Sequence, residues 1–65
     1  MISVNGEATE MRPGTTVAEL VAARGAPDRG VAVAIDGEVV PRTQWERTAL
    51  ADDAAVEIVM AVQGG

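Results

Sequence analysis

A chain of 65 residues forms one domain, and a domain of this size is too small for a deep active-site cavity beside a full hydrophobic core. The net charge of −5 disfavours nucleic acid as a partner, because phosphate binding needs a basic surface. The chain has no histidine and no cysteine, so it lacks the commonest general base, the thiol nucleophile and the softer metal ligands.

These absences predict that the chain is not an enzyme by itself. We expect no catalytic residue, no metal and no cofactor bound by the chain. The carboxylate pair Asp52-Asp53 is interpreted as part of a solvated turn. The chain begins without a basic and then apolar leader, and no run approaches the roughly 20 apolar residues of a membrane span. A cytoplasmic location is therefore expected, with a protein as the partner rather than nucleic acid or a membrane.

The chain opens with a predicted hairpin. Residues 2–4 alternate apolar and polar side chains, Asn5-Gly6 follows, and a second extended run covers residues 7–11. Asn-Gly is the strongest short-range hairpin signal, because both central residues of a type I′ turn need a positive φ. The first two strands are therefore expected to pair antiparallel.

A short helix is predicted next, over about 17–24. Thr16 and Glu19 match the capping box, in which each side chain accepts a hydrogen bond from the other residue's backbone N–H. The apolar residues that then fall on one helix face are Val17, Leu20 and Val21. Gly25 suits the position after the last turn, where a positive φ is common. A helix this short must be held by packing.

A second hairpin is predicted after the helix. Residues 31–35 form a continuous apolar run, which is typical of a strand buried on both faces. Asp36-Gly37 gives the turn signal, and residues 38–40 are expected to return antiparallel. Pro41 ends the return strand, because proline cannot donate a ladder hydrogen bond.

The segment that follows contains Trp45, the only aromatic residue of the chain. One interpretation is a short turn or 3-10 helix whose indole covers one end of the core. The other is an exposed anchor for a partner, since tryptophan and arginine are frequent interface hot spots and Arg42 is close in sequence. The residues favour the first interpretation. Leu50 is expected in the core, just before the Asp52-Asp53 turn.

The last predicted strand covers residues 55–62. Its side chains alternate between a face with Val56, Ile58, Met60 and Val62 and a face with Glu57, Val59 and Ala61. The strand leads into Gln63-Gly64-Gly65, so residues 62–65 are expected to form a flexible tail. A helix that crosses one sheet between two hairpin units is an α+β architecture.

The motifs resemble the ThiS family, the sulfur carriers of thiamine biosynthesis, which have the ubiquitin-like β-grasp fold. The matching segments are Asn5-Gly6, residues 14–20, residues 33–42 followed by Trp45, residues 56–59 and residues 61–65. Val-Pro-Arg before a tryptophan, joined to the Gly-Gly tail, is the most specific part. The family commonly has asparagine at Asp36 and an Asp-Gly-Asp turn where this chain reads Ala51-Asp52-Asp53-Ala54. The resemblance implies a mixed sheet of about four to five strands on one short helix, with residues 1–65 as a single sulfur-carrier domain.

The resemblance also implies a carrier cycle at the C-terminal residue. The Gly65 carboxylate would be adenylated by a ubiquitin-activating-type enzyme, converted to a thiocarboxylate and used to deliver sulfur to thiazole synthase. The ATP belongs to the activating enzyme. Val62, Gln63 and Gly64 would enter the partner's narrow channel, because glycine lets a backbone approach closely. The free chain is expected to be a monomer.

Other functions are compatible with the same residues. The molybdopterin synthase small subunit shares the fold, the tail and the thiocarboxylate, and a protein modifier or a carrier for cysteine biosynthesis shares the tail. A non-catalytic β-grasp interaction domain would tolerate residues added after Gly65, whereas a carrier needs that carboxylate free. The sheet face near Val59 and Ala61 is the candidate docking surface.

Overall fold

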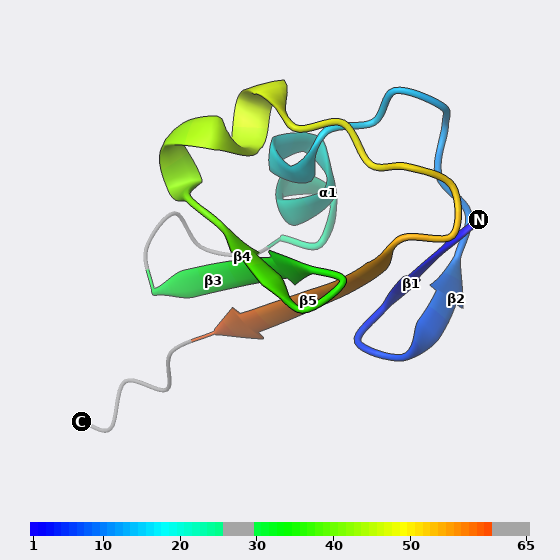
Figure 1. The fold of residues 1–65 in the computed structure, drawn as a ribbon, viewed down its shortest axis with the longest axis horizontal. Coiled ribbons are helices and arrows are strands. Elements are labelled where there is room, and N and C mark those ends of the chain that lie inside the picture. Colours follow the sequence, from blue (N-terminus) through cyan, green and yellow to red (C-terminus); the bar gives the residue numbers. More distant parts are fainter. Residues whose placement is uncertain (26–29, 61–65) are drawn as a thin grey trace.

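The computed structural model describes residues 1–25 and 30–60 (Figure 1). In chain order its elements are β1 (Ile2–Val4), β2 (Glu7–Thr9), α1 (Val17–Ala23), β3 (Val31–Ile35), β4 (Glu38–Val40), the 3-10 helix η1 (Arg42–Arg47) and β5 (Ala55–Met60). The described strands form one sheet in the order β2-β1-β5-β3-β4. β1 and β5 are parallel, and all other neighbours are antiparallel. The predicted α+β architecture, a mixed sheet with one short helix, is confirmed.

Both predicted hairpin turns are present. The central residues have φ of 52° and 84° at Asn5 and Gly6, and of 51° and 85° at Asp36 and Gly37. A Cβ added at either glycine would meet no atom within 4 Å, so the backbone conformation and not the space selects glycine there. β2 is shorter than predicted, since it ends at Thr9.

α1 begins with the predicted capping box. The Glu19 N–H donates to Thr16 Oγ1 over 3.2 Å, and the Thr16 N–H donates to Glu19 Oε1 over 2.9 Å. α1 ends one residue before the predicted boundary, and Gly25 follows with a φ of 69°. Within the described ranges, no helix has the length and apolar character needed to cross a membrane. A helix of seven residues is not stable alone, so its buried face must hold it.

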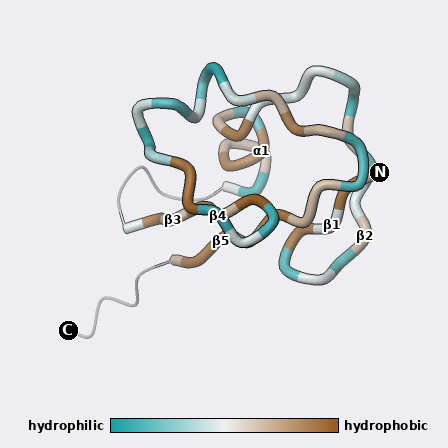
Figure 2. The backbone as a smooth tube through the Cα atoms, in the orientation of Figure 1, coloured by the Kyte–Doolittle hydropathy of each residue, from teal (hydrophilic) through white to brown (hydrophobic). Residues whose placement is uncertain are grey.

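The core lies between α1, η1 and one face of the sheet, here called the inner face. Its buried residues are Ile2, Val4, Val17, Leu20, Val21, Val33, Trp45, Leu50, Ala54, Val56 and Ile58. Figure 2 shows hydrophobic segments along β1, β3 and β5. Each large apolar side chain that is fully buried contributes about 1.5–3 kcal/mol, so burial is the main source of stability.

η1 closes one end of the core with Trp45. The indole is 7% exposed, and its Nε1–H donates to the Val40 carbonyl over 3.0 Å. The Arg42 guanidinium lies 5.8 Å from the ring centroid, within the range of a cation–π interaction. The first interpretation of this segment is therefore confirmed, because the indole is part of the core and is not an exposed anchor.

The segment after η1 runs beside the start of α1. The Val17 N–H donates to the Thr48 carbonyl over 3.0 Å, and the Leu50 N–H donates to the Thr15 carbonyl over 2.8 Å. These hydrogen bonds direct Leu50 into the core, as predicted. The predicted turn at Asp52-Asp53 follows, with Asp53 at a φ of 65°.

The predicted burial of β3 on both faces is wrong. Val33 is buried, but Ala32 is exposed and Ala34 is only half-buried. The physical reason is that α1 and η1 cover only the inner face of the sheet, and the apolar run says nothing about what covers the other side. In β5, Val56 and Ile58 face the core as predicted, whereas Met60, at the last rung of the β3–β5 ladder, is 47% exposed.

Candidate functional site at β5 and the outer sheet face

The predicted tail residues Val62, Gln63, Gly64 and Gly65 lie outside the described residues, as does Ala61 of the predicted docking surface. The structure does describe the strand that leads to them. β5 is the central strand of the sheet, between β1 and β3, and it ends at Met60. The C-terminal residues therefore follow a strand that is paired on both sides.

On its β1 side, β5 is held first by backbone and then by a side chain. The Ser3 N–H donates to the Ala54 carbonyl over 3.0 Å, and the Asn5 N–H donates to the Val56 carbonyl over 2.8 Å. The Asn5 side chain bonds Ile58, which is the next residue of β5 after Val56 whose backbone groups point toward β1. The Ile58 N–H donates to Asn5 Oδ1 over 2.8 Å, and Asn5 Nδ2 donates to the Ile58 carbonyl over 3.2 Å.

The second hairpin turn bonds the start of the same strand. The Asp36 N–H donates to the Ala55 carbonyl over 2.8 Å, and Asp36 Oδ1 accepts from the Ala55 N–H over 3.1 Å. Sequence reasoning missed these side-chain bonds, because it treated Asn5 and Asp36 only as residues that tolerate a positive φ. The available signal was chemical, since asparagine and aspartate also bond to backbone groups near turns.

The outer sheet face is the side of the sheet opposite α1, and small or apolar residues dominate it. By register and alternation it carries Ala32, Ala34, Val39, Glu57 and Val59, with Val39 opposite Ala34 and Val59 opposite Ala32. Val39 is 68% exposed and Val59 is 62% exposed. The prediction that Val59 lies on an exposed sheet face is confirmed. Ala32 and Ala34 were missed, because β3 was expected to be buried on both faces, and Val39 of β4 was not assigned to a face from the sequence.

Glu57 gives the outer sheet face its charge. It lies on β5 opposite Ala34 and is exposed. None of the arginines in the described part of the chain lies on a strand. The described strands therefore contribute no arginine that could pair with the Glu57 carboxylate. The outer sheet face is therefore suited to an apolar partner surface that also carries a basic side chain.

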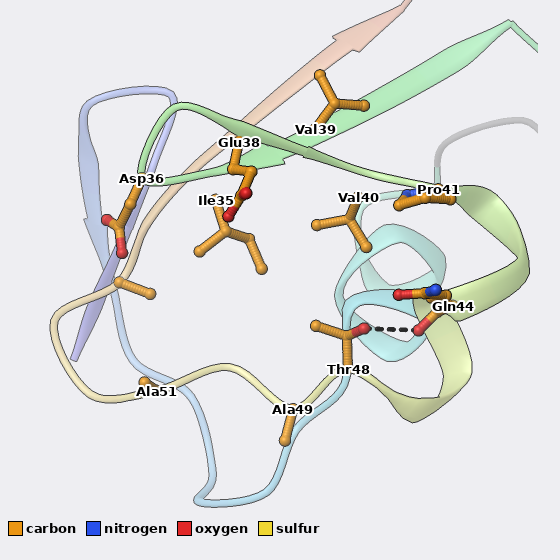
Figure 3. Close-up of a pocket in the computed structure, with 11 residues that line it drawn as sticks. Ile35, Asp36, Glu38, Val39, Val40, Pro41, Gln44, Thr48, Ala49 and Ala51 are labelled. Carbon is orange, nitrogen blue, oxygen red and sulfur yellow. Dashed lines mark hydrogen bonds between the residues drawn. The ribbon is translucent and has the colours of Figure 1, made fainter.

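A groove of about 540 Å³ lies between the β3–β4 hairpin and the segment 49–51 (Figure 3). Two of its polar side chains bond to the chain itself, since Thr48 Oγ1 donates to the Gln44 carbonyl over 2.7 Å and Asp36 Oδ1 accepts from the Ala55 N–H over 3.1 Å. Across the described ranges, no three aspartate or glutamate side chains gather closely enough to hold a metal ion. The hydroxyl of Thr48 in this groove donates to a backbone carbonyl and not to a carboxylate.

The chain is similar to known proteins over nearly its whole length. The model of the ThiS family matches residues 2–65. The crystal structure of a thiamine biosynthesis protein (ThiS) from Geobacter metallireducens has 30% sequence identity and a TM-score of 0.78, over 98% of this chain and 97% of that chain. The solution structure of a thiamine biosynthesis protein from the same organism has 30% identity and a TM-score of 0.80, over 98% and 86%. A search of curated proteins found no match.

These similarities confirm two predictions. The mixed sheet with one short helix has the ubiquitin-like β-grasp fold of the similar ThiS structure. The family suggested by the Gly-Gly tail and by Val-Pro-Arg before Trp45 is the family whose model matches. Because that match covers residues 2–65, the chain belongs to the ThiS family.

Proposed function

We propose that this chain is a sulfur carrier in thiamine biosynthesis and that its working group is the carboxylate of Gly65. A ubiquitin-activating-type enzyme adenylates this carboxylate with ATP, the adenylate becomes a thiocarboxylate, and thiazole synthase receives the sulfur. Membership of the ThiS family is the observation that carries the proposal. The chain itself is the carrier and binds no cofactor, and the partner enzymes supply the catalysis. We expect a monomer that works in the cytoplasm.

The chemistry explains why activation is needed. A carboxylate is a poor electrophile, and joining it to AMP releases pyrophosphate and creates an acyl–adenylate bond with a good leaving group. A sulfide-equivalent nucleophile then forms the carbon–sulfur bond, and the carbon–oxygen bond to AMP breaks. The resulting thiocarboxylate is a soft nucleophile that can pass its sulfur to an acceptor. None of these steps needs a histidine or a cysteine in this chain.

The outer sheet face supports a docking role within the same proposal. Val59 is exposed on β5, and Gly65 follows it by six residues. Six residues span at most about 20 Å. A partner that docks on Val39 and Val59 must therefore hold its adenylation site within about 20 Å of Val59.

The direct test is intact-mass analysis after incubation with ATP, a sulfur source and the activating enzyme. We expect exchange of one oxygen for sulfur at Gly65, and no exchange without ATP. The same chain with residues added after Gly65 is the control that separates a carrier from an interaction domain. The absence of exchange in the parent chain, or equal exchange in the extended chain, would rule out the proposed carrier.

Gly64→Ala tests the role of glycine in the partner's channel. The added Cβ should hinder entry, so thiocarboxylate formation should fall while the fold is unchanged. Normal formation by the variant, together with normal sulfur delivery, would show that the channel does not require glycine. Delivery by the parent chain to thiazole synthase rather than to molybdopterin synthase then assigns the pathway, and the opposite preference would move the chain to molybdopterin biosynthesis.

A further inference from the structure

We propose that Asn5 is a positioning residue that fixes the end of β5 from which the C-terminal residues lead. The inference rests on the proposed function, because it concerns the delivery of Gly65 to a partner. Asn5 bonds both backbone groups of Ile58, accepting over 2.8 Å and donating over 3.2 Å. Ile58 lies two residues before the end of β5 at Met60.

β5 extends beyond β1, its parallel neighbour, so a side chain must supply the next hydrogen bonds on that edge of β5. β1 pairs with β5 only at Ser3 opposite Ala55 and at Val4 opposite Val56. The chain then turns away at Asn5, whose φ is 52°. Backbone groups alternate along a strand, so the N–H and C=O of Ile58 point to the side that β1 has left. Ile58 is 8% exposed, and unpaired polar groups on a buried residue are destabilising.

The amide of Asn5 reproduces the missing backbone rung. A carboxamide presents one acceptor and one donor, as a peptide group does, and can therefore bond the N–H and the C=O of one residue together. An aspartate at this position would place a second acceptor oxygen against the Ile58 carbonyl. The requirement at position 5 is thus for a side-chain amide in addition to a residue that tolerates a positive φ.

The position of this amide links it to the tail. On the β3 side, the ladder continues to Met60, which pairs with Val31. On the β1 side, the bonds from Asn5 to Ile58 are the last that β5 makes among the described residues. A strand held along one edge alone is free to pivot about that edge, whereas bonds on both edges fix its direction. Asn5 therefore fixes the last described part of β5, from which the sequence continues toward Gly65.

Asn5→Gly removes the amide and keeps the turn, because glycine adopts a positive φ freely. The matched control is Asp36→Gly, which occupies the same position of the other turn, with a φ of 51°, and loses a bond to Ala55 at the start of β5. Asn5→Asp keeps the acceptor for the Ile58 N–H, but replaces the donor with an oxygen that faces the Ile58 carbonyl. A comparison of the three variants separates the effect of losing the Asn5 amide from the effects of changing a turn and of lowering overall stability.

The experiment measures amide hydrogen exchange of Ile58 together with kcat and KM for thiocarboxylate formation. In Asn5→Gly we expect exchange at Ile58 to be about tenfold faster, because its N–H has lost its partner. We expect kcat to be about tenfold lower with KM within about twofold, because docking is intact and the carboxylate is misplaced. Asn5→Asp should also lower kcat, and Asp36→Gly should leave kcat and KM within about twofold of the parent.

Each result bears on a different step. Unchanged hydrogen exchange at Ile58 in Asn5→Gly would show that the Asn5 side chain does not protect the Ile58 N–H, which would overturn the proposal. Faster exchange with a normal kcat, or equal losses in Asn5→Gly and Asp36→Gly, would overturn the positioning role. If the parent chain takes up no sulfur, the proposed function fails and the delivery role fails with it, while exchange at Ile58 and Met60 still decides whether Asn5 holds the end of β5.

Discussion

Asn5, Asp36 and Asp53 have φ between 51° and 65°, a conformation in which most side chains are strained. Asparagine and aspartate tolerate it better than other non-glycine residues, because their short polar groups bond to nearby backbone. Asn5 and Asp36 use those groups to bond β5. Asp53 stands in the turn before β5, and its N–H donates to the Met1 carbonyl over 2.8 Å.

Asp53 allows a test of backbone strain at a single residue. Asp53→Ala should lower the free energy of unfolding by about 1 kcal/mol, because alanine has no polar group to favour the left-handed conformation. Asp53→Gly should stay within about 0.5 kcal/mol of the parent, since glycine relieves the strain but gains freedom in the unfolded chain. Urea unfolding followed by Trp45 fluorescence measures both. An equal decrease in the free energy of unfolding in both variants would show that the loss of the aspartate side chain, and not backbone strain, is the cause.

At the scale of elements, α1 depends on its cap as well as on its buried face. Thr16→Ala removes the oxygen that accepts the Glu19 N–H and should lower the free energy of unfolding by about 1 kcal/mol. The control is Thr43→Ala at an exposed position of η1, for which we expect a change within about 0.5 kcal/mol. Urea unfolding of both variants makes the comparison. A loss at Thr43 as large as that at Thr16 would argue against a capping effect.

The elements that sequence reasoning predicted are those whose signals are local. The two turns need a positive φ at adjacent residues, and the capping box joins residues three apart, so neighbouring residue types suffice. The burial of β3 depends instead on which layers cover the sheet, and its apolar run carries no information on that. The bond from Asn5 to Ile58 joins residues 53 apart in sequence, and no spacing rule identifies such a pair. The Gly-Gly tail was found as a motif, but the structure does not describe it.

At the scale of the whole molecule, docking on the outer sheet face has a direct test. Val59→Gln should raise KM for the activating enzyme by about tenfold, because it places a polar side chain in the apolar contact. The free energy of unfolding should change by no more than about 1 kcal/mol, since Val59 is exposed.

Ala22→Gln is the matched control for the docking test. Ala22 is exposed on α1, away from the outer sheet face, and its replacement should leave KM within about twofold of the parent. Steady-state kinetics of adenylation compares the two variants. Equal KM values would place the docking surface elsewhere on the chain.

β5, the central strand of the sheet, comes after the other described strands in the sequence and is therefore synthesised after them. It pairs with β1 from the other end of the chain and contributes Val56 and Ile58 to the core. A nascent chain that has not reached residue 55 therefore has neither its middle strand nor a closed core, and long-range pairing of this kind forms late. Val59 lies on β5 as well. A partner that binds the outer sheet face therefore needs β5 to be in place. Such a partner binds only chains that have been synthesised to within a few residues of Gly65.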